Sequence, residues 1–134
     1  MSDLCERLQN LDEAGVYSLS CPQAILEANV ALSGLVLFEV NLGTSHGKGE
    51  LLANMAQVLQ APEWFGHNWD ALADVLGDLS WQAGDGYVLL LCGGGEKLGL
   101  TEVDYDLLMG VFNDSVSYWK SQGKPFWVFF SDDV

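Results

Sequence analysis

The sequence is poor in basic residues, in cysteine and in long apolar runs. It contains five Lys and Arg residues against nineteen Asp and Glu, which gives a formal net charge of −14 at pH 7. Nucleic acids and anionic membranes attract proteins through Lys and Arg, so this balance argues against direct binding of either. A field of this sign keeps a protein dispersed, and it also attracts a basic partner.

The three cysteines, Cys5, Cys21 and Cys92, are odd in number and form no CxxC spacing. Neither His46 nor His67 completes a metal-binding spacing with them, and no nucleophile motif is present. We therefore expect reduced thiols, no metal, no cofactor and no enzymatic activity. The first six residues lack a basic segment followed by an apolar stretch, and no apolar run approaches ~20 residues. These observations predict a cytoplasmic protein.

Apolar, β-rich segments alternate with helical patterns along the 134 residues. The predicted strands cover residues 16–20, 35–42, 87–91 and 126–130, and the predicted helices cover 21–32, 48–59, 68–79 and 102–122. Because the last three strand segments are almost continuously apolar, we expect them to be covered on both faces. Thr101 with Asp104 resembles a capping box, and Gly123 stands at the expected left-handed cap. The alternation predicts an α/β domain with a small, mainly parallel sheet of three to four strands.

The predicted helix at residues 68–79 has two chemically opposite sides when Asn68 is taken as its N-cap. The apolar side comprises Trp69, Leu72, Val75, Leu76 and Leu79. The acidic side comprises Asp70, Asp74, Gly77 and Asp78. Each like-charge pair four residues apart costs a helix about 0.2–0.5 kcal/mol. Asp70 is compensated by the helix dipole, whereas Asp74 is not. A solvated face remains one interpretation, but the uncompensated cost favours a binding partner.

The segment before this helix contains two large aromatic residues, Trp64 and Phe65, followed by Gly66. We predict that Phe65 joins the core and that Trp64 is at least partly exposed. Glycine lets a partner backbone approach closely, and an exposed aromatic beside carboxylates is typical of an interface hot spot.

Residues 62–74, which read PEWFGHNWDALAD, resemble the signature of the barstar family. That signature is a proline, an aromatic pair, a glycine, an asparagine, and Asp-Ala-Leu followed by another aspartate. A weaker resemblance extends over residues 35–131. The resemblance implies a small α/β fold with a parallel sheet, and it implies inhibition of a basic ribonuclease by blocking its active site.

The resemblance also implies roles for individual residues. Asp74 corresponds to the carboxylate that enters the phosphate-binding pocket of the nuclease, Asp70 to a second interface carboxylate, and Trp64 to an aromatic at the rim. The neighbouring contact positions are Gly66, Asn68, Trp69, Ala73 and Gly77. Asp114 matches a third acidic contact. Because Ala73 stands where family inhibitors can carry a large aromatic, we expect a thinner contact there.

Two other functions are compatible with the carboxylates. A receiver-like domain would use them to bind Mg²⁺ for phosphoryl transfer, provided that their oxygens converge at the carboxyl edge of the sheet. The candidates for such a site are Asp74, Asp78, Asp104, Asp106, Asp132 and Asp133. An acidic adaptor protein would share the carboxylate face but would not need the aromatic–Gly–Asn segment.

Residues 1–34 precede the family-like region and are predicted to extend it within one domain of 134 residues. The strand at 16–20, the helix to about Leu32 and the strand from Leu35 form a plausible βαβ unit. This unit would add a parallel strand to the sheet and give Tyr17 packing partners. We expect the free protein to be a monomer.

Overall fold

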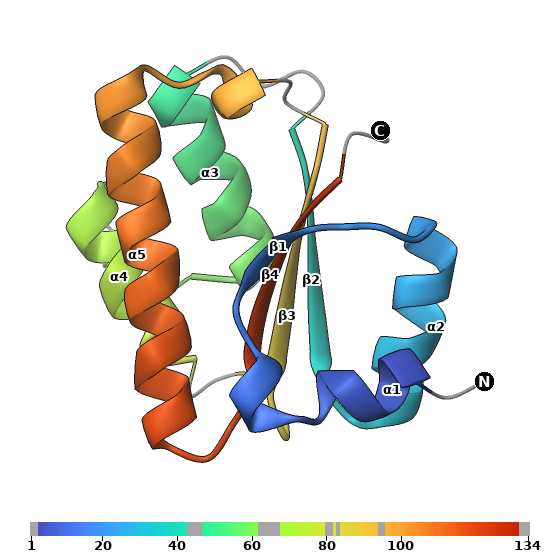
Figure 1. Ribbon diagram of the computed structural model, residues 1–134. Coiled ribbons are helices and arrows are strands. Elements are labelled where there is room, and N and C mark those ends of the chain that lie inside the picture. The colour runs from blue at the N-terminus through green and yellow to red at the C-terminus, as the bar shows by residue number, and fades with distance from the viewer. Residues whose placement is uncertain are drawn as a thin grey trace.

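A computed structural model describes residues 3–42, 47–61, 68–79, 82, 84–93 and 96–131, apart from the side chains of residues 3, 5 and 96 (Figure 1). Four parallel strands form one sheet in the order β1-β4-β3-β2. The strands are β1 (Val16–Ser18), β2 (Val36–Asn41), β3 (Tyr87–Cys92) and β4 (Phe126–Ser131). The predicted α/β fold with a parallel sheet is therefore confirmed.

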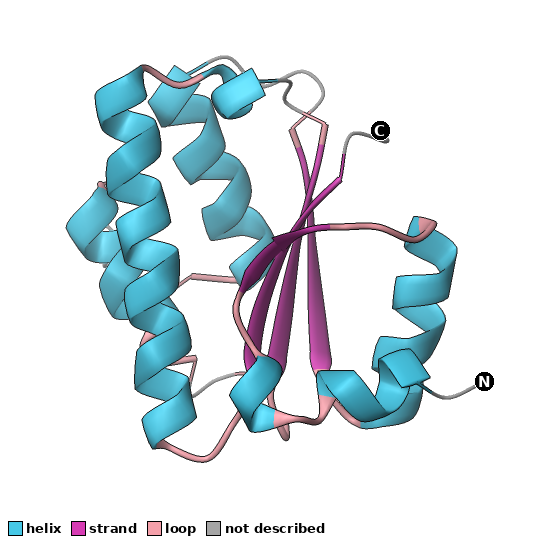
Figure 2. Ribbon diagram, in the orientation of Figure 1, coloured by secondary structure: helices cyan, strands magenta, loops and turns pink. Residues whose placement is uncertain are grey.

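Helices cover both faces of the sheet, in two unequal layers (Figure 2). One layer contains α1 (Asp3–Leu8), the short 3₁₀ helix η1 (Leu11–Glu13) and α2 (Gln23–Ser33). The other contains α3 (Gly47–Leu59), α4 (Trp69–Leu76), the 3₁₀ helix η2 (Glu96–Gly99) and α5 (Glu102–Ser121). Each layer packs on its own apolar cluster, and the cluster under α3, α4 and α5 is the larger.

Helix α4 is shorter than predicted, because it ends at Leu76 and not at Leu79. Gly77 is its C-cap, and the Asp78 N–H donates to the Val75 carbonyl, three residues back, at 3.1 Å. Leu79 then adopts a left-handed backbone with φ of 48° while its side chain remains fully buried. The last turn tightens to a bond between residues three apart. Leu79 therefore lies outside the helix, although its side chain still packs in the core.

Strands β3 and β4 form the centre of the sheet and are covered on both faces, as predicted. The same prediction is wrong for β2, which lies at an edge. Its residues Glu39 and Asn41 are exposed, because the helices beside β2 leave part of one strand face open to water. Their spacing of two residues is that of one strand face.

The N-terminal segment adds the predicted parallel strand, on the edge of the sheet opposite β2. Val16 is registered with Val128 and Tyr17 with Phe129. The connection through α2 therefore crosses the full width of the sheet. Tyr17 acquires the predicted packing, since its ring centroid lies 5.6 Å from that of Trp127 and 6.3 Å from that of Phe129. Its side chain nevertheless stays 45% exposed.

The ends of α5 agree with the sequence signals. The Thr101 hydroxyl accepts a hydrogen bond from the Asp104 N–H at 3.1 Å, which fixes the first turn. At the other end, Gly123 has φ of 79°, the left-handed conformation that glycine adopts without steric cost. Helix α5 is thereby set at a defined length beside α4, against which it packs.

Candidate protein-binding face

Helix α4 starts at the predicted N-cap and is oriented by its apolar side. The Asn68 side-chain oxygen accepts a hydrogen bond from the Ala71 N–H at 2.8 Å. This bond satisfies one of the backbone N–H groups of the first turn that have no partner within the helix. On the inner side, Leu72, Val75 and Leu76 are fully buried and Trp69 is 7% exposed. The burial of these side chains turns the opposite side of the helix towards solvent.

The outward surface of α4 carries carboxylates and small residues. Asp70, Asp74 and Asp78 are exposed, while Ala73 and Gly77 are half-buried. Asp70, Ala73, Asp74 and Gly77 have the spacing i, i+3, i+4 and i+7, which places them on one helical face. We call these four residues the α4 face. A Cβ at Gly77 would lie 3.2 Å from the Ala73 carbonyl oxygen. A larger residue at this position would therefore crowd the backbone, and glycine leaves this end of the α4 face without a protruding side chain.

Two tryptophans fasten α4 to α5, one at each end. Trp69 Nε1, at the start of α4, donates to Asp104 Oδ1 at 3.2 Å. Trp119 Nε1, from α5, donates to the carbonyl of Leu76 at 2.6 Å in a buried bond. The second bond satisfies one of the carbonyls that a helix end leaves without a partner. The α4 face is therefore presented on a rigid support.

A hollow of about 280 Å³ lies beside the N-terminal end of the α4 face. It is lined by Lys48, Asn68, Trp69, Asp70 and Leu107, and the Lys48 ammonium lies 5.3 Å from the centroid of the Trp69 ring. Lys48 and Leu107 were not expected at a site from the sequence, and Asp104 was expected only to cap a helix or to bind a metal. The available signal was Trp69 itself, because a buried indole N–H needs an acceptor.

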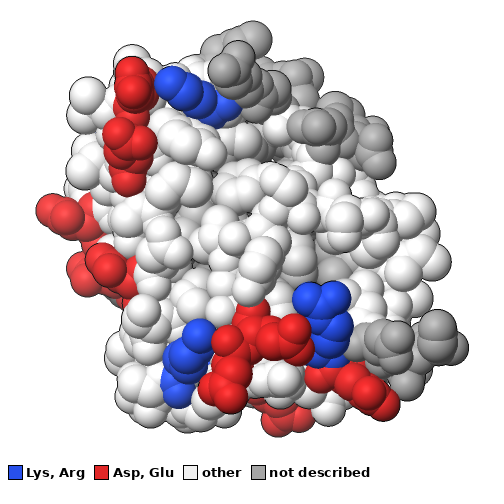
Figure 3. All heavy atoms as spheres, in the orientation of Figure 1, with Lys and Arg blue, Asp and Glu red and all other residues white. Residues whose placement is uncertain are grey.

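The carboxylates of α4 form no ion pair within the described part of the chain. No Lys or Arg there forms an ion pair with Asp70, Asp74 or Asp78, and the pair that does form, Arg7–Glu13, belongs to the N-terminal layer. Figure 3 shows carboxylates on the side of the molecule where α4 lies and near the N-terminal end of α5, and a further group along the lower edge of the view, among Lys and Arg. The α4 side is consequently acidic, and Lys48, which shares the hollow with Asp70, forms no ion pair with it.

Asp114 is exposed on α5. It follows Leu107 by seven residues, which is about two helical turns, so both occupy one side of α5. Leu107 lines the hollow beside Asp70, so Asp114 lies on the Leu107 side of α5, two turns beyond that hollow. Trp64, Phe65, Gly66 and the acidic pair Asp132 and Asp133 lie outside the described residues.

The receiver-like alternative requires carboxylates that converge on a metal ion. No three His, Cys, Asp or Glu side chains within the described ranges come together in a group able to hold a metal ion. Asp74 and Asp78 project from α4, and the Asp104 carboxylate binds the indole of Trp69. No helix in these ranges combines the length and apolarity needed to cross a membrane.

Comparison with known proteins gives one match. A family model described as Barstar (barnase inhibitor) matches residues 35–131. That segment contains β2, β3, β4 and the helices α3, α4 and α5, and hence the whole α4 face. The layer formed by α1 and α2, together with β1, precedes it. No curated protein sequence matches the chain.

Proposed function

The chain belongs to the barstar family, and on this basis we propose that it inhibits a basic ribonuclease by inserting the α4 face into the enzyme's RNA-binding cleft. The observation that carries the proposal is the pair Asp70 and Asp74. Both carboxylates are exposed on one side of a firmly held helix, and neither has an ion-pair partner among the described residues. A cleft that binds RNA phosphates offers the Arg and Lys residues that would pair with them.

In this mechanism the carboxylates occupy the places of RNA phosphates. Residues four apart on a helix have their Cβ atoms about 5–6 Å apart, so Asp70 and Asp74 can engage neighbouring cations at once. Burying a charge is favourable only when oriented partners replace its water. The bonds of Trp69 and Trp119 support this requirement, since a helix that is already fixed loses little freedom on binding.

Within this proposal, each residue of the face has a stated part. Asp74 enters the phosphate-binding pocket, Asp70 binds a second cation, and Asp114 extends the acidic contact onto α5. Trp64 contributes aromatic surface at the rim. The remaining contact positions are Gly66, Asn68, Ala73 and Gly77, and Trp69, which is 7% exposed, reaches the contact only where it lines the hollow beside Asp70. A small residue at Ala73 leaves room for a bulkier group of the nuclease, so the cognate enzyme should project further towards α4.

Titration of RNA cleavage tests the proposal. A panel of small basic bacterial ribonucleases, including those encoded by the protein's own host, is assayed with increasing protein. We expect complete inhibition of at least one enzyme near one-to-one stoichiometry. The double variant Asp70→Asn/Asp74→Asn should lose inhibition, whereas Asp12→Asn, which removes an exposed carboxylate from the N-terminal layer, should retain it.

Indifference of every nuclease to the wild-type protein contradicts the proposal. So does equal inhibition by wild type and by the double variant, because the α4 face would then be dispensable. An acidic adaptor would give the first of these results.

A further inference from the structure

The face of the sheet beneath α1 and α2 is incompletely covered. Helix α2 packs on β2, and α1 packs on α2. Over β1 and β4, the cover therefore comes from a six-residue helix and the chain that links it to β1. This short cover leaves a cleft of about 130 Å³ between the N-terminal segment and the sheet.

Three aromatic rings form the floor of the cleft. Trp127 and Phe129, two residues apart on β4, point to the same face and stack with centroids 5.5 Å apart at an interplanar angle of 8°. Tyr17 of β1 lies beside both of them. The indole of Trp127 donates to the Leu8 carbonyl at 2.9 Å, which ties α1 to the floor. The floor is therefore ordered and apolar, and Tyr17, at 45% exposed against 3% for Trp127 and 7% for Phe129, supplies most of its open surface.

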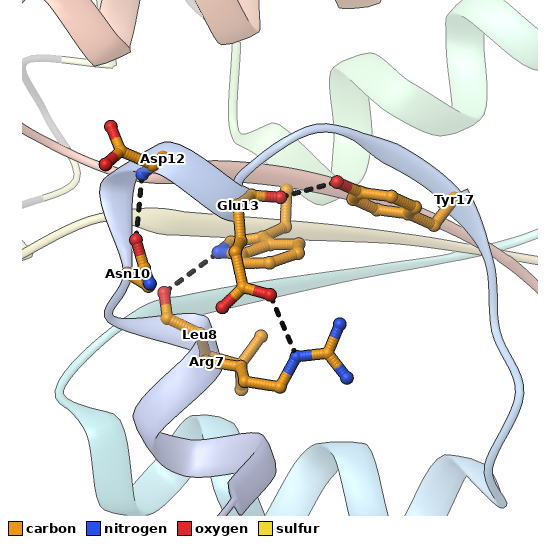
Figure 4. A network of polar contacts seen from close by, with 7 residues as sticks. Arg7, Leu8, Asn10, Asp12, Glu13 and Tyr17 are labelled. Atoms are coloured by element: carbon orange, nitrogen blue, oxygen red, sulfur yellow. Dashed lines mark hydrogen bonds and ion pairs between the residues drawn. The ribbon is translucent and has the colours of Figure 1, made fainter.

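The rim of the cleft is polar and carries one cation. Arg7 Nε donates to Glu13 Oε1 at 3.2 Å, and the Tyr17 hydroxyl donates to the Glu13 carbonyl at 2.6 Å (Figure 4). The two terminal nitrogens of Arg7 point away from Glu13, so the fork that binds a carboxylate remains open. Among the described residues, Arg7 is the one Lys or Arg that lines the cleft, and Cys21 lines it as a free thiol.

We propose that this cleft binds a small aromatic carboxylate, with the ring against the exposed Tyr17, beside Trp127 and Phe129, and the carboxylate on Arg7. The volume of the cleft limits the ligand to a single ring, because a cavity of ~150 Å³ in another protein accommodates benzene. Stacking surfaces favour a planar ring over an aliphatic chain. In a protein of net charge −14, a local cation is needed to attract an anion.

The proposed site is independent of the α4 face. Arg7, Tyr17 and Cys21 precede the family-matched segment at 35–131, and the cleft lies on the opposite face of the sheet from α4. Ligand binding there does not depend on the presence of a ribonuclease.

Ligand-observed NMR with benzoate as the probe tests the site. Benzoate should bind saturably with a dissociation constant of about 1 mM or tighter, the range of a small fragment. Benzamide, which has the same ring without the charge, should bind about tenfold more weakly, and acetate should not bind measurably. Bound benzoate should also slow alkylation of Cys21, read by peptide mass spectrometry, without slowing alkylation of the unfolded chain.

Two charge variants assign the carboxylate contact. Arg7→Gln should abolish the preference for benzoate over benzamide while leaving benzamide binding intact, which also shows that the cleft still exists. Lys120→Gln, which removes a cation on α5, should leave the preference unchanged. The proposal is overturned if benzoate shows no saturable binding, if Cys21 is not protected, or if the two variants behave alike.

Discussion

Replacing Trp119 with Phe tests whether the indole bond to Leu76 holds α4 in place. The side chain is 7% exposed, and its Nε1 donates to the Leu76 carbonyl at 2.6 Å in a fully buried position. Phe keeps an aromatic ring at the site, but it removes the donor. The last carbonyl of α4 is then left in the core without that partner.

The size of the effect follows from the burial of this bond. A stranded buried acceptor costs about 1–3 kcal/mol, and the smaller ring forfeits some packing. We therefore expect Trp119→Phe to lower the free energy of unfolding by about 2–4 kcal/mol. Trp69→Phe is the matched control. Its acceptor Asp104 is half-buried and regains water, so the smaller ring's packing loss dominates and the total should stay at about 1–2 kcal/mol.

Urea unfolding of the three proteins, followed by far-ultraviolet circular dichroism, measures the difference. The slope of free energy against urea should be the same in all three, since the fold is unchanged. A loss below about 0.5 kcal/mol for Trp119→Phe, or a larger loss for Trp69→Phe, refutes the reasoning that the Trp119 bond anchors the helix.

Four further results are expected. The pKa of Glu39 is raised from 4.5 to about 7, first by a hydrogen bond with the Glu27 side chain, then by burial of Glu39, and then by like-charge repulsion from Glu27. The folded state therefore holds a proton that the unfolded state has released, and unfolding free energy should fall as pH rises from 4.5 to 7. Because Glu39 is exposed, solvent screening limits the effect, and Glu39→Gln should flatten the slope with a gain of at most about 1 kcal/mol at pH 8. Asn68→Ala, which removes the N-cap bond, should cost about 1 kcal/mol in urea unfolding. Deleting residues 1–33 should lower the melting temperature, because the floor of Trp127 and Phe129 would face water; an unchanged temperature would show that this segment does not stabilise the sheet. Salt should slow association with the nuclease in stopped-flow measurements, since the Debye length shrinks to about 3 Å at 1 M.

Local patterns predicted most of the elements and the candidate face. The N-cap at Asn68, the two sides of α4, and the ends of α5 depend on neighbours in the sequence, and the structure agrees with them. The exposure of β2 was also readable, because Glu39 and Asn41 alternate with apolar residues at the spacing of one strand face. The prediction for β2 relied on its high apolar content and so overlooked this alternation.

The contacts that the sequence did not predict join distant segments. Trp69 and Asp104 are 35 residues apart, and Trp119 lies 43 residues from Leu76. The pairing of β1 with β4 also joins distant segments. A local pattern identifies a strand, but it does not say which edge of the sheet that strand joins. Helix α1 was missed because six residues are too few to establish a helical period.

The dissociation rate of a complex between this protein and its cognate ribonuclease tests the central proposal most directly. Asp74→Ala would leave the cations of the nuclease buried and unpaired, at a cost of about 2–5 kcal/mol. Dissociation should therefore accelerate at least about 30-fold, whereas Asp12→Asn should change it little. If Asp74→Ala binds as tightly as the wild type and instead unfolds more easily, Asp74 is a structural residue and the α4 face is not the inhibitory surface.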